Sequence, residues 1–247
     1  MDVSVQENVS AEMHDGIVLR SDLYRPTPNG RYPVLLCRTP YGKSTKGNVD
    51  IAFQMASMGY LVVLQDIRGR YSSEGEFTWL FQHKSESLDD KDGYDTVEWA
   101  ATLPGSDGQV GVWGHSFPAW CAWRLAEANP PSLKALFTSG MSAKSLDVNF
   151  GVLELGRRFQ STYEMASDAR RRDGHEYGPK SREEATQYWH EVERAKWIWH
   201  LPLSEIPNYV FSTLTPMLKR FMREQHNEMW EFDKIHHKVN VPVCVLT

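Results

Sequence analysis

Residues Val110-Gly-Val-Trp-Gly-His-Ser-Phe-Pro118 join a short apolar run to a segment with helical spacing, and this junction decides the fold. The run Val110–Trp113 predicts a buried strand, and Ser116–Asn129 predicts a helix that Pro130 ends. A tight turn between a strand and a helix can lift a serine hydroxyl above a sheet, at the positive end of the helix dipole. That setting favours the negative charge of a tetrahedral intermediate, so Ser116 is a candidate nucleophile.

The turn departs from the usual G-x-S-x-G pattern, because Pro118 stands where the second glycine is expected. Proline is acceptable in the first helical turn, where its missing N–H would have no helical partner anyway. Taken alone, the pattern G-x-S-x-P is also compatible with a serine that only caps a helix. Its position between a strand and a helix favours the nucleophile over the cap.

Strands and helices alternate through the rest of the first half. The apolar runs Pro33–Cys37 and Tyr60–Leu64 have the length of strands that a parallel sheet buries on both faces. Leu19–Tyr24 alternates apolar and polar residues and predicts a half-exposed strand. The alternation predicts an α/β fold with a mostly parallel sheet. The other predicted elements are helices over Ile51–Met58 and Asp92–Thr102 and a strand over Leu133–Phe137.

The second half differs from the first in composition and in the spacing of its apolar residues. From about residue 145 the chain is rich in Trp, Tyr, Met and charged residues at helical spacing, and a strand pattern returns only at Val239–Leu246. The arginine run 170–172, flanked by acids, is expected on a solvated face. The clearest amphipathic helix is Glu183–Trp199, whose aromatic residues are expected to pack inward: Tyr188, Trp189, Trp197 and Trp199. We therefore expect a first core part over 1–144, a helical cap insertion over 145–237 and a returning core strand over 238–247.

Composition and charge exclude several classes of protein. The 247 residues are 41% hydrophobic and 24% charged, which is typical of a soluble globular protein and not of collagen, a coiled coil or a disordered chain. With 27 basic and 32 acidic residues the net charge is −5, which argues against a nucleic-acid partner. The longest apolar runs are too short to cross a membrane.

The cysteines and the N-terminus predict a cytoplasmic location. Cys37, Cys121 and Cys244 are widely spaced and odd in number, which is typical of buried free thiols in a reducing compartment. The same spacing does not suit a structural zinc site. The first ten residues, MDVSVQENVS, lack the basic and apolar regions of a signal peptide.

The first half carries five motifs in a fixed order. They are Met13–Pro26, Arg38–Tyr41 (R-T-P-Y), Gln65–Arg70 (Q-D-I-R-G-R), Ser73–Phe77 (S-E-G-E-F) and Asp107–Ser116. The D-x-R-G motif followed by S-E-G-E-F is considerably more specific than the serine turn alone. Over about residues 9–140, the motifs resemble the cocaine esterase and Xaa-Pro dipeptidyl-peptidase family of α/β-hydrolases.

The resemblance implies a serine hydrolase that cleaves an ester or amide through an acyl-enzyme, on acyl ester, acylase or Xaa-Pro peptide substrates. It assigns Ser116 as the nucleophile, with the phenolic O–H of Tyr41 and the backbone N–H of Phe117 as donors to the oxyanion. It implies no metal and no organic cofactor. Four charged residues are expected to hold loops together, the first two as a charge pair: Asp66, Arg68, Glu74 and Glu76.

The family's catalytic acid and histidine have no counterpart in the sequence. In the family the acid follows the strand after the cap, in a G-W-x-D-like turn, and the histidine comes later still. Val241–Thr247 corresponds to that strand. His115 adjoins the nucleophile, but the turn is expected to direct its ring away from the hydroxyl. We therefore expect the chain to be an N-terminal portion of an α/β-hydrolase, truncated before the end of the sheet.

Other functions stay open at this point. A catalytically incomplete domain of this fold could bind a ligand or partner through the acyl pocket. A metal-dependent hydrolase is disfavoured because the sequence has no H-E-x-x-H motif. The oligomeric state stays open as well, since an unfinished sheet leaves an edge strand able to pair with another chain.

Overall fold

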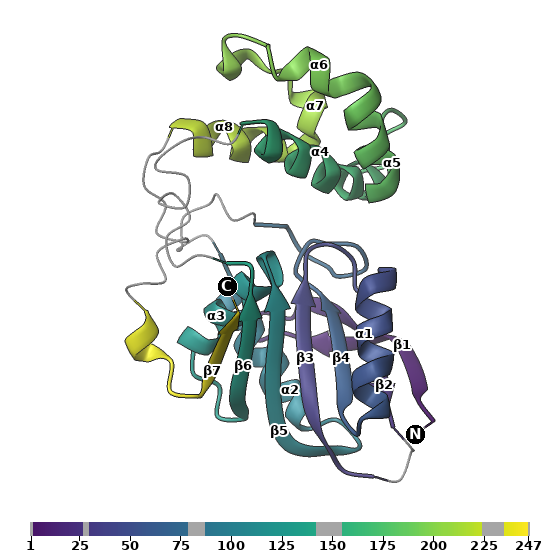
Figure 1. Cartoon of the computed structure of the whole chain (residues 1–247), viewed down its shortest axis with the longest axis vertical. Helices are drawn as coiled ribbons and strands as arrows, with labels where there is room; N and C mark the ends of the chain where they lie inside the picture. Colours follow the sequence, from purple (N-terminus) through teal and green to yellow (C-terminus); the bar gives the residue numbers. More distant parts are fainter. Residues whose placement is uncertain (1, 27–29, 79–86, 142–154, 224–234, 247) are drawn as a thin grey trace. The chain divides into compact units, whose positions relative to one another are not determined.

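The computed structural model describes residues 2–26, 30–78, 87–141, 155–223 and 235–246. The chain divides into two compact units, the first made of residues 1–77, 87–143 and 232–247, the second of residues 78–86 and 144–231. The first unit holds the sheet and the second is helical (Figure 1). Within the described residues, no helix is both long and apolar enough to cross a membrane.

The sheet of the first unit has seven strands in the order β1-β2-β4-β3-β5-β6-β7. β1 and β2 pair antiparallel, as do β2 and β4, and every pairing from β4 to β7 is parallel. This mostly parallel sheet confirms the predicted fold class. The strands are β1 (Ser4–Glu12), β2 (Val18–Arg25), β3 (Tyr32–Thr39), β4 (Leu61–Asp66), β5 (Ser106–His115), β6 (Leu133–Ser139) and β7 (Val243–Leu246).

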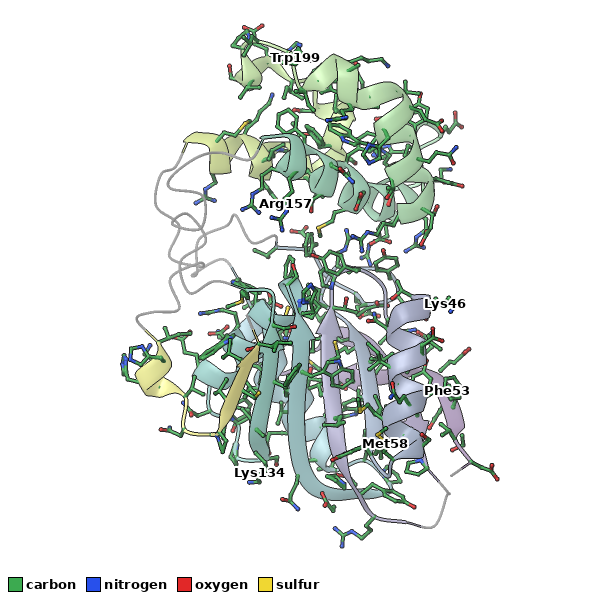
Figure 2. The ribbon with its side chains drawn as sticks, viewed as in Figure 1. Lys46, Phe53, Met58, Lys134, Arg157 and Trp199 are labelled. Atoms are coloured by element: carbon green, nitrogen blue, oxygen red, sulfur yellow. The ribbon has the colours of Figure 1, made fainter. Side chains whose placement is uncertain are left out.

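Helices cover both faces of the central strands (Figure 1). Along β4, Leu61 and Val63 belong to the core cluster that also contains residues of α2 (Asp89–Ala101) and α3 (Phe117–Glu127). The alternate residues of β4 belong to the cluster under α1 (Lys46–Ser57). Successive side chains of a strand point to opposite faces, so a continuous apolar run is what double burial requires. Figure 2 shows the exposed side chains of α1, namely Lys46, Phe53 and Met58, the last just beyond its C-terminal end.

Two expectations about the first unit are wrong. β2 is almost wholly buried instead of half-exposed, because it lies between β1 and β4 and contributes Leu23 and Tyr24 to opposite core clusters. Cys37 and Cys121 are buried free thiols as expected, but Cys244 on β7 is exposed.

The returning segment before β7 also belongs to the first unit. The short helix His236–Lys238 spans the expected boundary between the cap and the returning strand, and Lys238 bonds to the sheet unit. The Asn129 side-chain amide donates to the Lys238 carbonyl at 2.7 Å, and Lys238 Nζ pairs with Glu127 at 2.8 Å. These bonds tie the short helix to the end of α3 through Lys238.

The second unit packs α4 (Leu155–Arg172) against a continuous helical stretch of α5 (Arg182–Tyr188), a π-helical turn (Trp189–Glu193) and α6 (Arg194–Trp197). Phe159 and Trp189 each contact Phe211, with ring centroids 5.3 Å and 6.5 Å apart. The remaining helices are α7 (Asn208–Phe211) and α8 (Thr215–Arg223).

Three side chains of the second unit differ from expectation. Trp189 and Trp197 are buried as expected, but Tyr188 is 42% exposed and Trp199, which follows the end of α6, is 82% exposed (Figure 2). Arg170 is buried, 4.6 Å from the ring centroid of Tyr163, because it continues the inward stripe of α4 at helical spacing.

A buried polar cluster lies at the start of α2. Arg38 on β3 donates to the Asp89 carbonyl at 3.0 Å, and its guanidinium lies 3.7 Å from the Asp89 carboxylate and 3.9 Å from that of Asp92. Burial raises the pKa of Asp89 to about 6, from 3.8, although the nearby Arg38 acts in the opposite direction. The pKa is therefore higher in the folded chain than in the unfolded one.

We expect this carboxyl to make the stability of the chain depend on pH. The folded chain binds the Asp89 proton more tightly than the unfolded chain does. The protonated Asp89 carboxyl therefore adds to the free energy of unfolding fully below about pH 4, and this addition is lost as pH rises through about 6. Asp89→Asn removes the titration. Between about pH 4 and pH 7, the free energy of unfolding of the variant should gain up to about 3 kcal/mol relative to wild type. Urea unfolding across that range measures this gain, and a difference that stays constant with pH would contradict it.

Candidate active site

Ser116 is the single residue between the end of β5 and the start of α3. Its φ is 61° and its ψ is −122°, a left-handed backbone that is strained for any residue except glycine. The Ser116 N–H donates to the Ser139 carbonyl at 2.9 Å, and the Ser116 carbonyl accepts from the Trp120 N–H at 3.1 Å. The backbone on either side of the serine is therefore fixed by the neighbouring strand and by the helix.

Two glycines make the turn sterically allowed. A Cβ on Gly114 would lie 2.3 Å from the carbonyl carbon of Pro118, so only glycine lets β5 approach the first turn of α3 this closely. A Cβ on Gly140, which follows β6, would lie 2.3 Å from Cε1 of His115. The absence of side chains at both positions leaves room for the strained turn.

The Ser116 hydroxyl does not cap α3, although the residue occupies the N-cap position. Ser116 is partly buried, and its hydroxyl makes no hydrogen bond with any residue that the structure describes. The helix-capping interpretation of the serine is therefore not what the structure shows. Among the described residues, the hydroxyl therefore stands at a helix N-terminus without serving as its cap.

In the described part of the first unit, no histidine side chain lies at the Ser116 hydroxyl. His115 turns to Ser139, with its Nδ1 3.0 Å from the Ser139 hydroxyl, as the turn geometry predicts. His14 contacts Asp95 at 2.8 Å, far along the sheet at the β1–β2 turn. No histidine of the described part of the first unit hydrogen-bonds to Ser116, and His83 and His226 lie outside the described residues.

Tyr41 and Phe117 lie together. Tyr41 follows β3 and Phe117 opens α3 after β5, and β3 pairs in parallel with β5, so both residues leave the same edge of the sheet. Their ring centroids are 6.2 Å apart at an interplanar angle of 84°, an edge-to-face contact. The Phe117 ring is buried and also contacts Trp120 at 5.3 Å and Phe77 at 6.2 Å. The three residues singled out from the sequence therefore gather at one end of β3 and β5.

The charged residues after β4 hold loops, but with other partners than expected. Arg68 donates to Asp92 at 2.6 Å and pairs with Asp15 at 2.9 Å, and the Asp92 contact raises the pKa of Arg68. The Asp66 carboxylate accepts the Lys43 N–H at 2.7 Å instead of pairing with Arg68. Glu74 accepts the Val18 N–H at 3.1 Å, which ties the S-E-G-E-F loop to β2. Glu76 is exposed.

Sequence reasoning missed three buried residues behind Tyr41. Two of them, Thr39 and Lys43, belong to the loop that carries Tyr41, and the third, Arg70, donates to the Pro40 carbonyl of that loop. All three are at least 94% buried. The available sequence signal was membership of a motif, since Thr39 lies in Arg38–Tyr41 and Arg70 lies in Gln65–Arg70. What the sequence does not give is that these two motifs meet.

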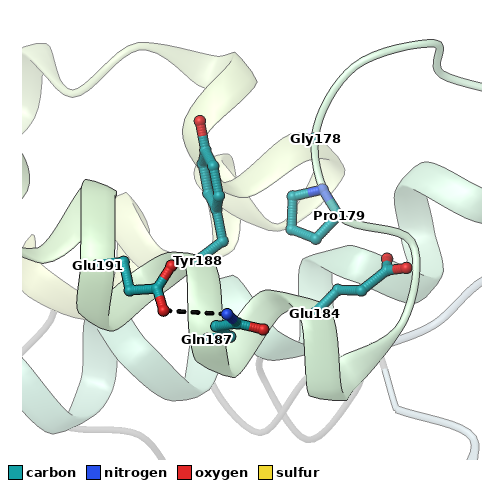
Figure 3. A pocket seen from close by; sticks show the side chains of 6 residues that line it. All are labelled: Gly178, Pro179, Glu184, Gln187, Tyr188 and Glu191. Atoms are coloured by element: carbon teal, nitrogen blue, oxygen red, sulfur yellow. Dashed lines mark hydrogen bonds between the residues drawn. The ribbon is translucent and has the colours of Figure 1, made fainter.

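A cavity of about 490 Å³ lies within the second unit (Figure 3). Its two carboxylates have partners: Glu184 accepts the Lys180 and Ser181 N–H groups, and Glu191 accepts the Gln187 amide at 3.0 Å. The six lining residues include no serine, cysteine or histidine: Gly178, Pro179, Glu184, Gln187, Tyr188 and Glu191. Across the described part of the chain, no group of three or more His, Cys, Asp or Glu residues is arranged to hold a metal ion.

A mostly parallel sheet with a serine on a strained turn between a strand and a helix is the arrangement of the α/β-hydrolases. A family model described as X-Pro dipeptidyl-peptidase (S15 family) matches residues 15–247, and the chain belongs to this family. The family resemblance predicted from the motifs is thereby confirmed.

Individual relatives agree with this assignment. Cocaine esterase of Rhodococcus sp. (strain MB1 Bresler) is 40% identical over 146 residues, which are 57% of this chain and 24% of that protein. An aminopeptidase from the marine sediment archaeon Thaumarchaeota archaeon superposes with a TM-score of 0.72 at 18% identity, over 99% of this chain and 43% of that one. A CocE/NonD family hydrolase from Staphylococcus aureus gives 0.57 at 24% identity, over 78% and 37%. The chain thus spans less than half the length of each.

Proposed function

We propose that this chain carries the nucleophile of a serine hydrolase that cleaves an ester or amide through an acyl-enzyme. The strained backbone of Ser116 at the β5–α3 junction is the observation that carries the proposal. A left-handed serine is costly by about 1–3 kcal/mol and is retained where the position of its hydroxyl matters. In the proposed reaction, Ser116 Oγ attacks the substrate carbonyl, the alcohol or amine leaves, and water releases the acid.

The proposed oxyanion site consists of the Tyr41 hydroxyl and the Phe117 N–H. A phenol donates a hydrogen bond while remaining neutral near pH 7, and the Phe117 N–H stands at the first turn of α3, where helix N–H groups have no helical acceptor. Both donors would act on charge that develops only in the transition state. The edge-to-face contact of the two rings supports their common placement.

We infer that the general base comes from outside the described residues of the first unit, since none of their histidines reaches Ser116. The substrate is an ester, an amide or an Xaa-Pro peptide, in line with the names of the family and of the cocaine esterase and aminopeptidase that this chain resembles. The chemistry uses protein groups and water, without a metal or organic cofactor. A catalytically incomplete domain that binds a ligand or partner is the second candidate, favoured by the same lack of a histidine at the serine.

The setting of the reaction is also a proposal. The three cysteines form no disulfide with one another, and two of them are buried, which supports a reducing compartment such as the cytoplasm. The partner is a small molecule or peptide substrate, with no role for nucleic acid or a membrane.

Labelling tests the nucleophile. In the protein as its cell makes it, a fluorophosphonate probe should modify Ser116, and Ser116→Ala should abolish both labelling and turnover, because the phosphorus bonds to the serine oxygen. Mass spectrometry of the labelled peptide locates the adduct. Labelling that persists unchanged in the alanine variant would remove Ser116 from the mechanism.

A second prediction concerns the base. Removing triad members from serine hydrolases costs about 10⁴–10⁶ in kcat. The isolated polypeptide of residues 1–247 should therefore hydrolyse p-nitrophenyl butyrate barely above the buffer rate. Robust hydrolysis that is lost in Ser116→Ala would show that a base lies within residues 1–247 and would overturn the expectation that these residues lack the family's catalytic histidine.

The third prediction tests Tyr41 in the protein as its cell makes it. Tyr41→Phe removes one hydroxyl and keeps the ring against Phe117. An oxyanion donor should cost about 10²–10³ in kcat, with KM less affected. A tyrosine that serves only the turn would instead lower Tm and leave kcat nearly normal. A fall in kcat of less than about threefold would leave the oxyanion site with backbone donors alone.

A further inference from the structure

The peptide unit between Pro40 and Tyr41 is held at both of its polar ends by buried side chains. Its carbonyl, on Pro40, accepts a hydrogen bond from Nε of Arg70 at 2.9 Å. Its N–H, on Tyr41, donates to the Thr39 hydroxyl at 3.1 Å. Arg70 is 2% exposed and Thr39 is 1% exposed, so water does not compete for these groups. The peptide plane immediately before the tyrosine therefore has one permitted orientation.

Arg70 is itself fixed by aromatic rings. Its guanidinium carbon lies 4.9 Å from the ring centroid of Phe77 and 5.4 Å from that of Tyr71, both within the range of cation–π contact. The Phe77 ring in turn packs on Phe117, with centroids 6.2 Å apart. Arg70 thus bonds to the loop that carries Tyr41, one proposed oxyanion donor. It also packs on Phe77, which contacts Phe117, the residue that supplies the other donor.

The loop on the far side of Tyr41 is fixed independently. Asp66 accepts the Lys43 N–H at 2.7 Å, and Lys43 Nζ pairs with Asp22 at 2.8 Å. Gly42 has φ +97°, and a Cβ there would lie 3.1 Å from the ring of Tyr71. Without the contacts to the Pro40–Tyr41 peptide, the loop would still be anchored at Lys43, but the backbone just before the tyrosine would lose its two buried hydrogen bonds.

We propose that Arg70, together with Thr39, is a positioning residue that holds the Tyr41 hydroxyl where the oxyanion forms. This inference rests on the proposed function. It assigns Arg70 a role through Tyr41 and not through contact with substrate. Misplacement of a reacting group by about 1 Å can cost about 10²-fold in rate, so loss of the clamp should reduce turnover even though every catalytic atom remains.

A double-mutant cycle on the protein as its cell makes it tests the proposal. Arg70→Met keeps the apolar stem against Phe77 and removes the donor to Pro40. We expect kcat for p-nitrophenyl butyrate to fall about 10–10²-fold with KM within about threefold. In a Tyr41→Phe background, the same substitution should cost less than about threefold, because the hydroxyl it positions is already gone. Thr39→Val removes the acceptor for the Tyr41 N–H. It should likewise lower kcat when Tyr41 is present and cost less than about threefold in the Tyr41→Phe background.

Controls separate positioning from general stability. Arg124→Met removes another buried arginine, one that pairs with Glu127 along α3, and should lower Tm while leaving kcat near wild type. If Arg70→Met does not fold, Arg70→Lys and Thr39→Val carry the cycle, since both are close in size to the native side chain. Equal costs of these substitutions with and without the Tyr41 hydroxyl would overturn the positioning role alone. A normal kcat in Tyr41→Phe would instead overturn the oxyanion role of Tyr41, and the positioning role with it.

Discussion

The architecture of the first unit depends on a single-residue junction between a central strand and a helix. β5 ends at His115 and α3 begins at Phe117, so Ser116 alone must redirect the chain, and it does so in a left-handed conformation. The strain of about 1–3 kcal/mol is offset by the burial of α3, whose Ala122, Leu125 and Ala126 lie in the main core cluster. A buried aliphatic side chain of leucine size contributes about 1.5–3 kcal/mol, so the packed helix outweighs the strained turn. The serine is held in place by the core beneath it.

Parallel pairing explains why the site gathers at one edge. β3, β4 and β5 are neighbours, and their carboxyl ends deliver Tyr41, Asp66 and Ser116 to the same edge of the sheet. β6 and β7 extend that edge, with Ser139 in register with His115 on one side and with Leu246 on the other. The sheet therefore sets the spacing of chemical groups before any loop conformation is considered.

The sequence predicts what depends on local pattern and fails where distant contacts decide. The strands, the serine turn and the alternation are local, and the structure shows them within a few residues of the predicted bounds. Arg170 looked like part of a solvated run because its sequence neighbours are charged, whereas in the structure it lies over the Tyr163 ring of its own helix and donates to the Val210 carbonyl of α7. Arg68 pairs with Asp92 and Asp15 and not with Asp66, because the fold brings together segments that are distant in sequence. For the site, residue types and their order were predictable, but the meeting of the two motifs around Pro40 was not.

Phe117 links the two halves of the proposed oxyanion site. Pro118 contributes no N–H, so the first turn of α3 has one donor fewer to offer a developing oxyanion, and more depends on the Phe117 N–H. The same residue buries its ring edge-to-face against Tyr41 and packs on Phe77, which lies under Arg70. Tyr41 is held from its own loop by Arg70 and Thr39, and it contacts α3 through the Phe117 ring. Contacts on both sides therefore fix the separation of the two proposed donors, and a fixed separation is what binding a single oxyanion requires.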